Sequence, residues 1–278
     1  MMKIDLHVHT NVSDGKLAPA ELMALAASRN VELLAIADHD AVAGIDPALE
    51  AGAQYPKLRL IPAIELSSHA PGNEVHVLGY FIQHNDPELI KELQVLQDSR
   101  GERARAIVAK LRGMGMNVSL ERVQEIAGAG SIGRPHIAQA LMEKGYVSSF
   151  REVFDKYLGQ GGPAYVDRHK LTPAQAIGLI LRFGGIPVLA HPTTLNLEAL
   201  LPNMLAAGLA GLEVHYKDFS RDTRQEMAEL ARRHNLITTG GTDYHGIEES
   251  EVMLGEAGVP EAVAESLFAL ARKMGIAV

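Results

Sequence analysis

The sequence predicts an α/β protein, a seven-stranded (β/α) barrel with a helical insertion. The first observation is that short apolar runs rich in Val, Ile and Leu alternate with amphipathic helical stretches along most of the chain. Such alternation favours parallel strands joined by helices. The second observation is a break in this rhythm from about Asp86 to Leu158, where only helical patterns occur. The third is histidine and carboxylate residues that recur near the ends of the expected strands.

The expected strands are short and are bounded by polar residues, Gly or Pro. They cover Lys3–His7, Glu32–Asp38, Leu58–Leu66, Val75–Phe81, Ile186–Ala190, Gly211–Tyr216 and Leu236–Asp243. Helical periodicity between them predicts helices over Ala18–Ser28, Leu197–Ala207, Thr223–His234 and Pro260–Lys273. A further helix begins at Thr172-Pro173, where Gln175 completes a capping box. Seven strands of this kind indicate a barrel with one strand fewer than the usual eight.

The middle of the chain predicts a separate helical unit. Asp86 is a good N-cap and Pro87 fits the first helical position. Further helical patterns, separated by glycines, cover Arg103–Met114, Leu120–Ile126, Arg134–Glu143 and Ser148–Tyr157. A unit of roughly 70 residues is within the usual size range of a domain. We therefore expect a discontinuous barrel over residues 1–90 and 164–278, and a helical insertion domain over residues 91–163.

Composition limits the function classes. The 278 residues, 47% of them apolar, suit one globular domain of the barrel type. The formal charge of −8 gives no broad positive surface for long duplex nucleic acid, although a local basic pocket can still bind a nucleotide. The chain has no cysteine, so disulfides and thiolate ligands are excluded and any metal is held by nitrogen and oxygen.

The chain also gives an expectation about its location. The beginning of the sequence lacks a basic segment followed by a long apolar one, and no run of 18 apolar residues occurs. We expect a cytoplasmic protein without a signal peptide or membrane span. Nothing in the sequence implies a protein partner or fixes the oligomeric state.

Histidines and carboxylates recur where the expected strands end. His7 and His9 have the i, i+2 spacing that places both side chains on one face of a strand. The carboxyl ends of parallel barrel strands converge on one rim, and buried carboxylates gathered there need cations. The sequence therefore predicts a metal centre. The candidate residues are His7, His9, Asp14, His39, Glu65, His76, His191, Asp243 and His245. Asp38 and Asp40 flank His39 and are expected to orient imidazoles.

These motifs resemble the polymerase and histidinol phosphatase (PHP) family. The matching segments are Asp5-Leu6-His7-Val8-His9-Thr10, Ser13-Asp14-Gly15, Ala37-Asp38-His39-Asp40, Pro62-Ala63-Ile64-Glu65, Glu74-Val75-His76-Val77-Leu78-Gly79, Ala190-His191-Pro192 and Gly241-Thr242-Asp243-Tyr244-His245. They follow one another in order along the chain. The helical segment Ser131-Ile132-Gly133-Arg134-Pro135-His136 is similar to the subgroup of 3′,5′-nucleoside bisphosphate phosphatases.

The resemblance implies a distorted seven-stranded barrel and three divalent metal ions. It implies that the first ion binds His7, His9, Glu65 and Asp243, that the second binds Glu65, His76 and His191, and that the third binds Asp14, His39 and His245. The family's phosphatases often have histidine where this chain has Asp14. Nitrogen and oxygen ligands suit Mn²⁺, Zn²⁺ and Fe²⁺ alike, so the sequence leaves the metal's identity open.

Such a centre suits the hydrolysis of a phosphate monoester. A water between two metals becomes a hydroxide near neutral pH, and the metals neutralise charge on the phosphate oxygens. The expected catalytic residues are His191, Asp243 and Arg134. The proton donor to the leaving group is left open between His191 and a water on the third metal. Arg134 is the first candidate for binding a substrate phosphate, since arginine can donate two parallel hydrogen bonds. Arg168, Lys217 and His215 are further substrate-binding candidates.

The subgroup resemblance implies a small phosphorylated substrate. The expected reaction is removal of the 3′-phosphate from nucleoside 3′,5′-bisphosphates, with 5′-to-3′ exonuclease action on short RNA or DNA oligonucleotides as a second activity. Three alternatives stay open: a histidinol phosphatase, a metal-dependent amidohydrolase, and a non-enzymatic metal-binding regulatory module. Amidohydrolases of this type often use a carboxylated lysine as the metal bridge, and here Glu65 occupies that position.

Overall fold

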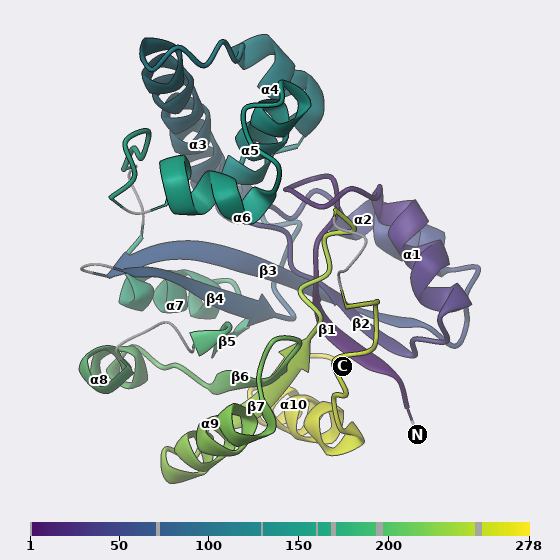
Figure 1. Ribbon diagram of the computed structural model, residues 1–278. Helices are drawn as coiled ribbons and strands as arrows, with labels where there is room; N and C mark the ends of the chain where they lie inside the picture. Colours follow the sequence, from purple (N-terminus) through teal and green to yellow (C-terminus); the bar gives the residue numbers. More distant parts are fainter. Residues whose placement is uncertain are drawn as a thin grey trace.

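The computed structural model describes residues 2–70, 73–128, 130–159, 161–167, 171–192, 197–247 and 252–278. Within them, a seven-stranded sheet has its strands in sequence order (Figure 1). The strands are β1 (Ile4–Val8), β2 (Leu33–Ile36), β3 (Arg59–Ala70), β4 (Asn73–Tyr80), β5 (Ile186–Leu189), β6 (Gly211–Tyr216) and β7 (Ile237–Gly241). Each overlaps one of the segments that the sequence predicts as strands, although β3 runs four residues beyond its predicted end, and the mixed α/β fold is confirmed.

Strand β4 departs from the expected parallel pairing. It pairs antiparallel with both β3 and β5, whereas the other neighbouring strands are parallel. The reason is that β3 and β4 follow each other directly, without a crossover helix between them. The first half of β4 consequently lies beside the end of β3, where Ser67 pairs with His76.

The sheet curls until its first and last strands almost meet, giving a distorted barrel. The N–H of His9 donates to the carbonyl of Tyr244 at 2.9 Å, and the N–H of Thr242 donates to the Asp5 carboxylate at 2.9 Å. The close approach requires glycine at position 241, because a Cβ atom there would lie 2.5 Å from the backbone nitrogen of His7. The carboxyl ends of β1 and β7 are thereby fixed side by side.

Helices cover the outside of the barrel. They are α1 (Pro19–Ser28), α2 (Ile45–Gly52), α7 (Pro173–Arg182), α8 (Leu197–Ala206), α9 (Arg221–Arg233) and α10 (Glu261–Lys273). The sequence analysis did not predict α2, whose eight residues include a glycine and a proline. In the part of the chain that the structure describes, no helix combines the length and the apolar character needed to cross a lipid bilayer.

The insertion contains α3 (Pro87–Gly113), α4 (Leu120–Ala127), α5 (Arg134–Glu143) and α6 (Phe150–Val153), and a π-helical turn follows over Phe154–Leu158. It forms the upper group of helices in Figure 1. Instead of a break before Arg103, α3 is one continuous helix of 27 residues. Gly101 is tolerated inside it because the apolar side chains on both sides are buried.

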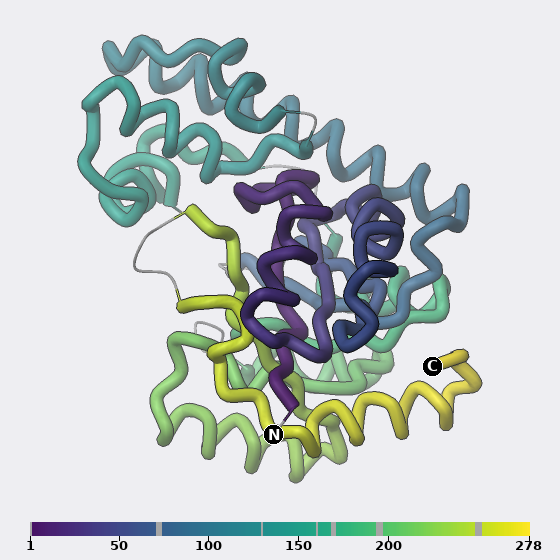
Figure 2. The backbone as a smooth tube through the Cα atoms, turned by 90° about the vertical axis from the view of Figure 1, so that its right-hand side faces the viewer, coloured from purple at the N-terminus to yellow at the C-terminus, as the bar shows by residue number. Residues whose placement is uncertain are grey.

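Helix α3 belongs to two hydrophobic cores. Leu89, Leu93 and Leu96 pack with the barrel core, whereas Ala104 and Ile107 pack in a separate core formed by the insertion helices. The predicted domain boundary after residue 90 therefore falls inside a helix, and the division into two domains stays a prediction. Figure 2 shows the insertion (teal) beside the loop that follows β1 (purple). The N–H of Ser131 donates to the carbonyl of Val12 at 3.0 Å there.

Candidate metal centre

The nine side chains predicted as metal ligands lie together at one end of the barrel. They come from β1 and the loop after it, from the segment after β2, from the middle of β3, from the first half of β4, and from the segments after β5 and β7. Each of the nine has a ring nitrogen or carboxylate oxygen within 3.9 Å of such an atom of another member. The antiparallel direction of β4 explains why His76, early in its strand, reaches the same rim.

Glu65 is at the centre of the group and is fully buried. Its two oxygens face five imidazole nitrogens at 3.0–3.4 Å, from His7, His9, His39, His76 and His191. Asp243 adds a second carboxylate beside the first strand, with Oδ1 at 3.0 Å from His9 Nε2 and 3.4 Å from His7 Nε2.

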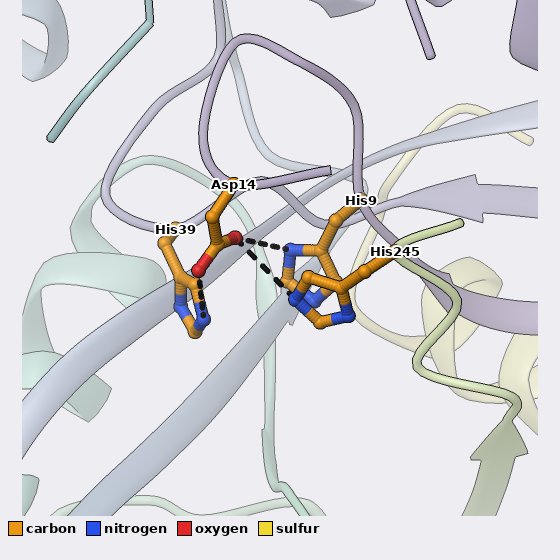
Figure 3. A group of neighbouring side chains, drawn as sticks. All are labelled: His9, Asp14, His39 and His245. Atoms are coloured by element: carbon orange, nitrogen blue, oxygen red, sulfur yellow. Dashed lines mark ion pairs between the residues drawn. The ribbon is translucent and has the colours of Figure 1, made fainter. Parts of the chain in front are cut away.

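Asp14 forms a second focus of contacts, shown in Figure 3. Its Oδ1 lies 3.4 Å from His245 Nε2 and 3.9 Å from His9 Nδ1, and its Oδ2 lies 3.8 Å from His39 Nε2. The rings of His9 and His245 stack at 4.2 Å between centroids. His39 lies between the two foci, because its other nitrogen, Nδ1, is 3.1 Å from Glu65.

The donor atoms form three groups compatible with a metal ion. They are His7, His9, Glu65 and Asp243; His39, Glu65 and His76; and His9, Asp14, His39 and His245. In each group the atoms lie within 4.8 Å of one another. The first group coincides with the set predicted for the first ion. The second contains His39, although Nε2 of the predicted His191 is also only 3.1 Å from Glu65.

Many of these buried atoms have no hydrogen-bond partner. Among the described residues, the cluster contributes seven such atoms: His7 Nε2, His9 Nδ1, His9 Nε2, Asp14 Oδ1, His39 Nδ1, Glu65 Oε2 and His76 Nδ1. Leaving one buried polar atom unpaired costs about 1–3 kcal/mol. Seven in one place are incompatible with a purely structural polar core. Divalent cations would accept the lone pairs that these imidazoles and carboxylates present, so the residues present fit a metal centre.

At His39 and Glu65, the electrostatics favour the protonation states that bind metals. Burial lowers the pKa of His39 to about 3 against the opposing effect of Glu65, so the ring is neutral at pH 7. Burial alone would raise the pKa of Glu65, but His39, His7 and His76 outweigh it and hold that pKa well below the usual range. A buried, ionised carboxylate therefore faces at least one neutral imidazole.

Asp38 supports the loop that carries Asp14. It accepts hydrogen bonds from Thr10 N at 2.8 Å, Thr10 Oγ1 at 2.6 Å and Ser13 Oγ at 2.6 Å. Asp38 was predicted to orient an imidazole, but within the described residues its carboxylate accepts hydrogen bonds only from this loop.

Asp40 holds a different pair of neighbours. It accepts from Arg100 Nε at 2.8 Å and from the N–H of Ser67 at 2.8 Å. It thereby joins the insertion helix α3 to the end of β3.

The sequence analysis missed Glu213 and Tyr216 on β6. The Glu213 carboxylate lies 3.1 Å from His7 Nδ1 and accepts from the N–H of His191 at 2.9 Å. Tyr216 donates its hydroxyl hydrogen to Asp243 Oδ2 at 2.9 Å. A signal for Glu213 was present, because a glutamate inside the apolar run Gly211–Tyr216 is unusual in a buried strand.

A pocket of about 190 Å³ adjoins the cluster. Its lining includes Asp14, His39, His76 and His245 on the barrel side, and Arg100, Arg103 and Arg134 from the insertion. Arg134 forms an ion pair with Glu74 of β4, and its guanidinium lies 5.4 Å from the centre of the Phe154 ring. Arg100 and Arg103 are cations that the sequence analysis did not single out, because their position inside α3 gives no sign of the pocket.

The other substrate-binding candidates are placed differently. Lys217 donates to the carbonyl of Asp243 at 2.9 Å, so it lies at the centre but holds a backbone group there. His215 is half-buried beside Arg224, and burial lowers its pKa. Within the described ranges no ion pair or hydrogen bond joins it to the cluster. Arg168 lies outside the described residues. The roles of all three in substrate binding stay predictions.

The comparisons with known proteins agree with this geometry. The PHP domain model matches residues 5–162. The 5′-3′ exoribonuclease Rnm of Escherichia coli is 38% identical over 247 residues, which are 87% of this chain and 84% of that protein. The 3′,5′-nucleoside bisphosphate phosphatase of Chromobacterium violaceum is 34% identical over 251 residues, 88% of each chain.

A solved structure shows the same fold. It is that of a Bifidobacterium adolescentis protein described as a metal-dependent phosphoesterase, with a TM-score of 0.88, 27% identity and 96% of both chains covered. The matched domain contains six of the nine clustered residues, and the remaining three, His191, Asp243 and His245, complete the same rim in space. The chain therefore belongs to the PHP family of metal-dependent phosphoesterases, and is a phosphoric ester hydrolase.

Proposed function

We propose that this enzyme removes the 3′-phosphate from nucleoside 3′,5′-bisphosphates at a centre of three divalent cations. The observation that carries the proposal is the set of seven unpartnered buried donor atoms beside a pocket lined by arginines. The similarity to the bisphosphate phosphatase of Chromobacterium violaceum supports the choice of substrate.

We assign one cation to each of three sets of side chains. His7, His9, Glu65 and Asp243 would hold the first, and Glu65, His76 and His191 the second. Asp14, His39 and His245 would hold the third. The contact between Glu65 Oε1 and His191 Nε2, at 3.1 Å, supports His191 in the second set.

In the proposed reaction, the chain binds and orients the phosphate around the centre. Cations bound there would neutralise phosphate oxygens and lower the pKa of a water molecule. The guanidinium of Arg134 lies at the pocket and is directed by Glu74, so it can donate to a phosphate of the substrate. His191 lies at the edge of the cluster with 28% of its side chain exposed, and because its Nε2 is assigned to the second cation, its Nδ1 is the candidate proton donor to the leaving oxygen.

Short RNA is the second candidate substrate, because the Escherichia coli relative is named a 5′-3′ exoribonuclease. The alternative of an amidohydrolase has less support from the site. Glu65 lies at the centre of the cluster, and the described part of the cluster places no lysine against it.

The test is a substrate panel with the Mn²⁺-loaded enzyme. Nucleoside 3′,5′-bisphosphates, histidinol phosphate and 5′-phosphorylated short RNA are compared by kcat/KM. We expect the bisphosphates to be the best substrates, with phosphate released from the 3′ position. Turnover of histidinol phosphate alone would refute the assignment, and preferred turnover of RNA would establish the second candidate instead.

A further inference from the structure

Strand β6 provides none of the nine residues assigned to the cations, yet it contains Glu213, which is fully buried. A carboxylate without charge compensation is costly inside a sheet. Both of its oxygens have partners: Oε1 faces His7 Nδ1 at 3.1 Å and Oε2 accepts from the N–H of His191 at 2.9 Å. One carboxylate therefore connects a residue of β1 with a residue that follows β5.

The contact with His7 determines which ring nitrogen carries hydrogen. A carboxylate only accepts hydrogen bonds, so Nδ1 must be the donor in this pair. Nε2 then presents its lone pair to the cluster, where it lies 3.3 Å from Glu65 and 3.4 Å from Asp243. A metal-binding imidazole is commonly fixed in this way by a carboxylate on its far nitrogen.

The contact with His191 acts on the backbone. His191 has a φ of 26°, in the left-handed region that residues other than glycine seldom adopt. The hydrogen bond from its N–H to Glu213 helps to hold the backbone there, with Nε2 directed at Glu65 Oε1. The same carboxylate thus orients one residue assigned to the first cation and one assigned to the second.

We propose that Glu213 is a positioning residue that sets the affinity of two neighbouring cation sites by fixing the His7 ring and the His191 backbone. The inference rests on the metal centre of the proposed function, but not on the identity of its substrate. Glu213 itself contacts neither the pocket lining nor the assigned cation-facing atoms, so its effect passes through His7 and His191.

The test compares Glu213→Gln with the wild type in metal binding. The amide keeps the size of the side chain but loses the negative charge that favours hydrogen on Nδ1. We expect the Mn²⁺ dissociation constants of the two tightest sites, measured by calorimetry, to rise about 10–100-fold. Excess Mn²⁺ should restore kcat toward the wild-type value, with KM nearly unchanged. The control is Glu143→Gln, the same change at an exposed pair with Arg122 on the insertion.

A purely structural role would lower the melting temperature of the metal-free protein and leave Mn²⁺ affinity within about threefold, and this result would overturn the proposal. A wild type that binds no Mn²⁺ would refute the metal centre itself.

A measurement on the unmutated protein covers the case in which Glu213→Gln does not fold. In the Zn²⁺-loaded enzyme, ¹⁵N–¹H spectra of the histidine rings should show His7 with hydrogen on Nδ1 and none on Nε2. Hydrogen on Nε2 would contradict the proposal.

Discussion

At the scale of single residues, the loop after β1 illustrates how a buried carboxylate places a candidate ligand. Asp38 is 1% exposed and accepts three hydrogen bonds from Thr10 and Ser13, immediately before Asp14. We expect Asp38→Ala to lower the free energy of unfolding by about 2–4 kcal/mol, because it leaves buried donors unpaired. Urea unfolding of the metal-free protein measures this loss.

The same variant should also lose the cation assigned to Asp14, so that bound Mn²⁺ per chain falls by about one by elemental analysis. The matched control is Asp46→Ala, which removes an exposed carboxylate hydrogen-bonded to His84 and should change neither quantity appreciably. Equal losses in the two variants would contradict the role given to Asp38.

At the scale of elements, the contact between β1 and β7 brings the candidate ligands of the first strand beside those that follow the last strand. Gly241 lies against His7 so closely that an added Cβ would be 2.5 Å from the His7 Cβ and 2.9 Å from an oxygen of Asp5. We expect Gly241→Ala to cost about 3 kcal/mol or more, because two strands must separate. Mn²⁺ affinity should fall as well, since His7 moves away from Glu65.

Gly178→Ala is the matched control for this change. Gly178 is exposed in helix α7, and an added Cβ would meet nothing within 4 Å. The substitution should stabilise the protein by about 0.5–1 kcal/mol, because alanine is the better helix former. Thermal melts of both variants give the comparison. A Gly241→Ala protein as stable as the wild type would show that the strands are not in contact as described.

The strands also differ in how far the sequence predicts them. The strands and the candidate ligands could be predicted from the sequence because apolar runs end in histidines and carboxylates, as at His7 and Asp243. The antiparallel direction of β4 could not be predicted, because an apolar run has the same pattern in a parallel and in an antiparallel strand. Glu213 was missed because the sequence does not show which residue its carboxylate contacts, and only the fold places His7 against it.

At the scale of the whole molecule, the barrel and the insertion divide the proposed site between them. The barrel provides the nine clustered residues, whereas Arg100, Arg103 and Arg134 reach the pocket from α3 and α5. Asp40 of the barrel forms an ion pair with Arg100, and Glu74 forms one with Arg134, so ion pairs also join the two units. This arrangement predicts that changes in the insertion alter substrate binding without altering the metal centre.

Arg134→Ala tests that separation. Loss of a charged hydrogen bond to phosphate is worth about 1.5–3 kcal/mol, so KM for a nucleoside 3′,5′-bisphosphate should rise about 10–100-fold. Bound Mn²⁺ per chain should stay at the wild-type value, because no oxygen or nitrogen of Arg134 belongs to the three donor groups. Arg122→Ala is the control within the insertion, since Arg122 pairs with Glu143 at the surface and away from the pocket. If Arg134→Ala loses metal, or if KM stays unchanged, the insertion does not act on the substrate through Arg134.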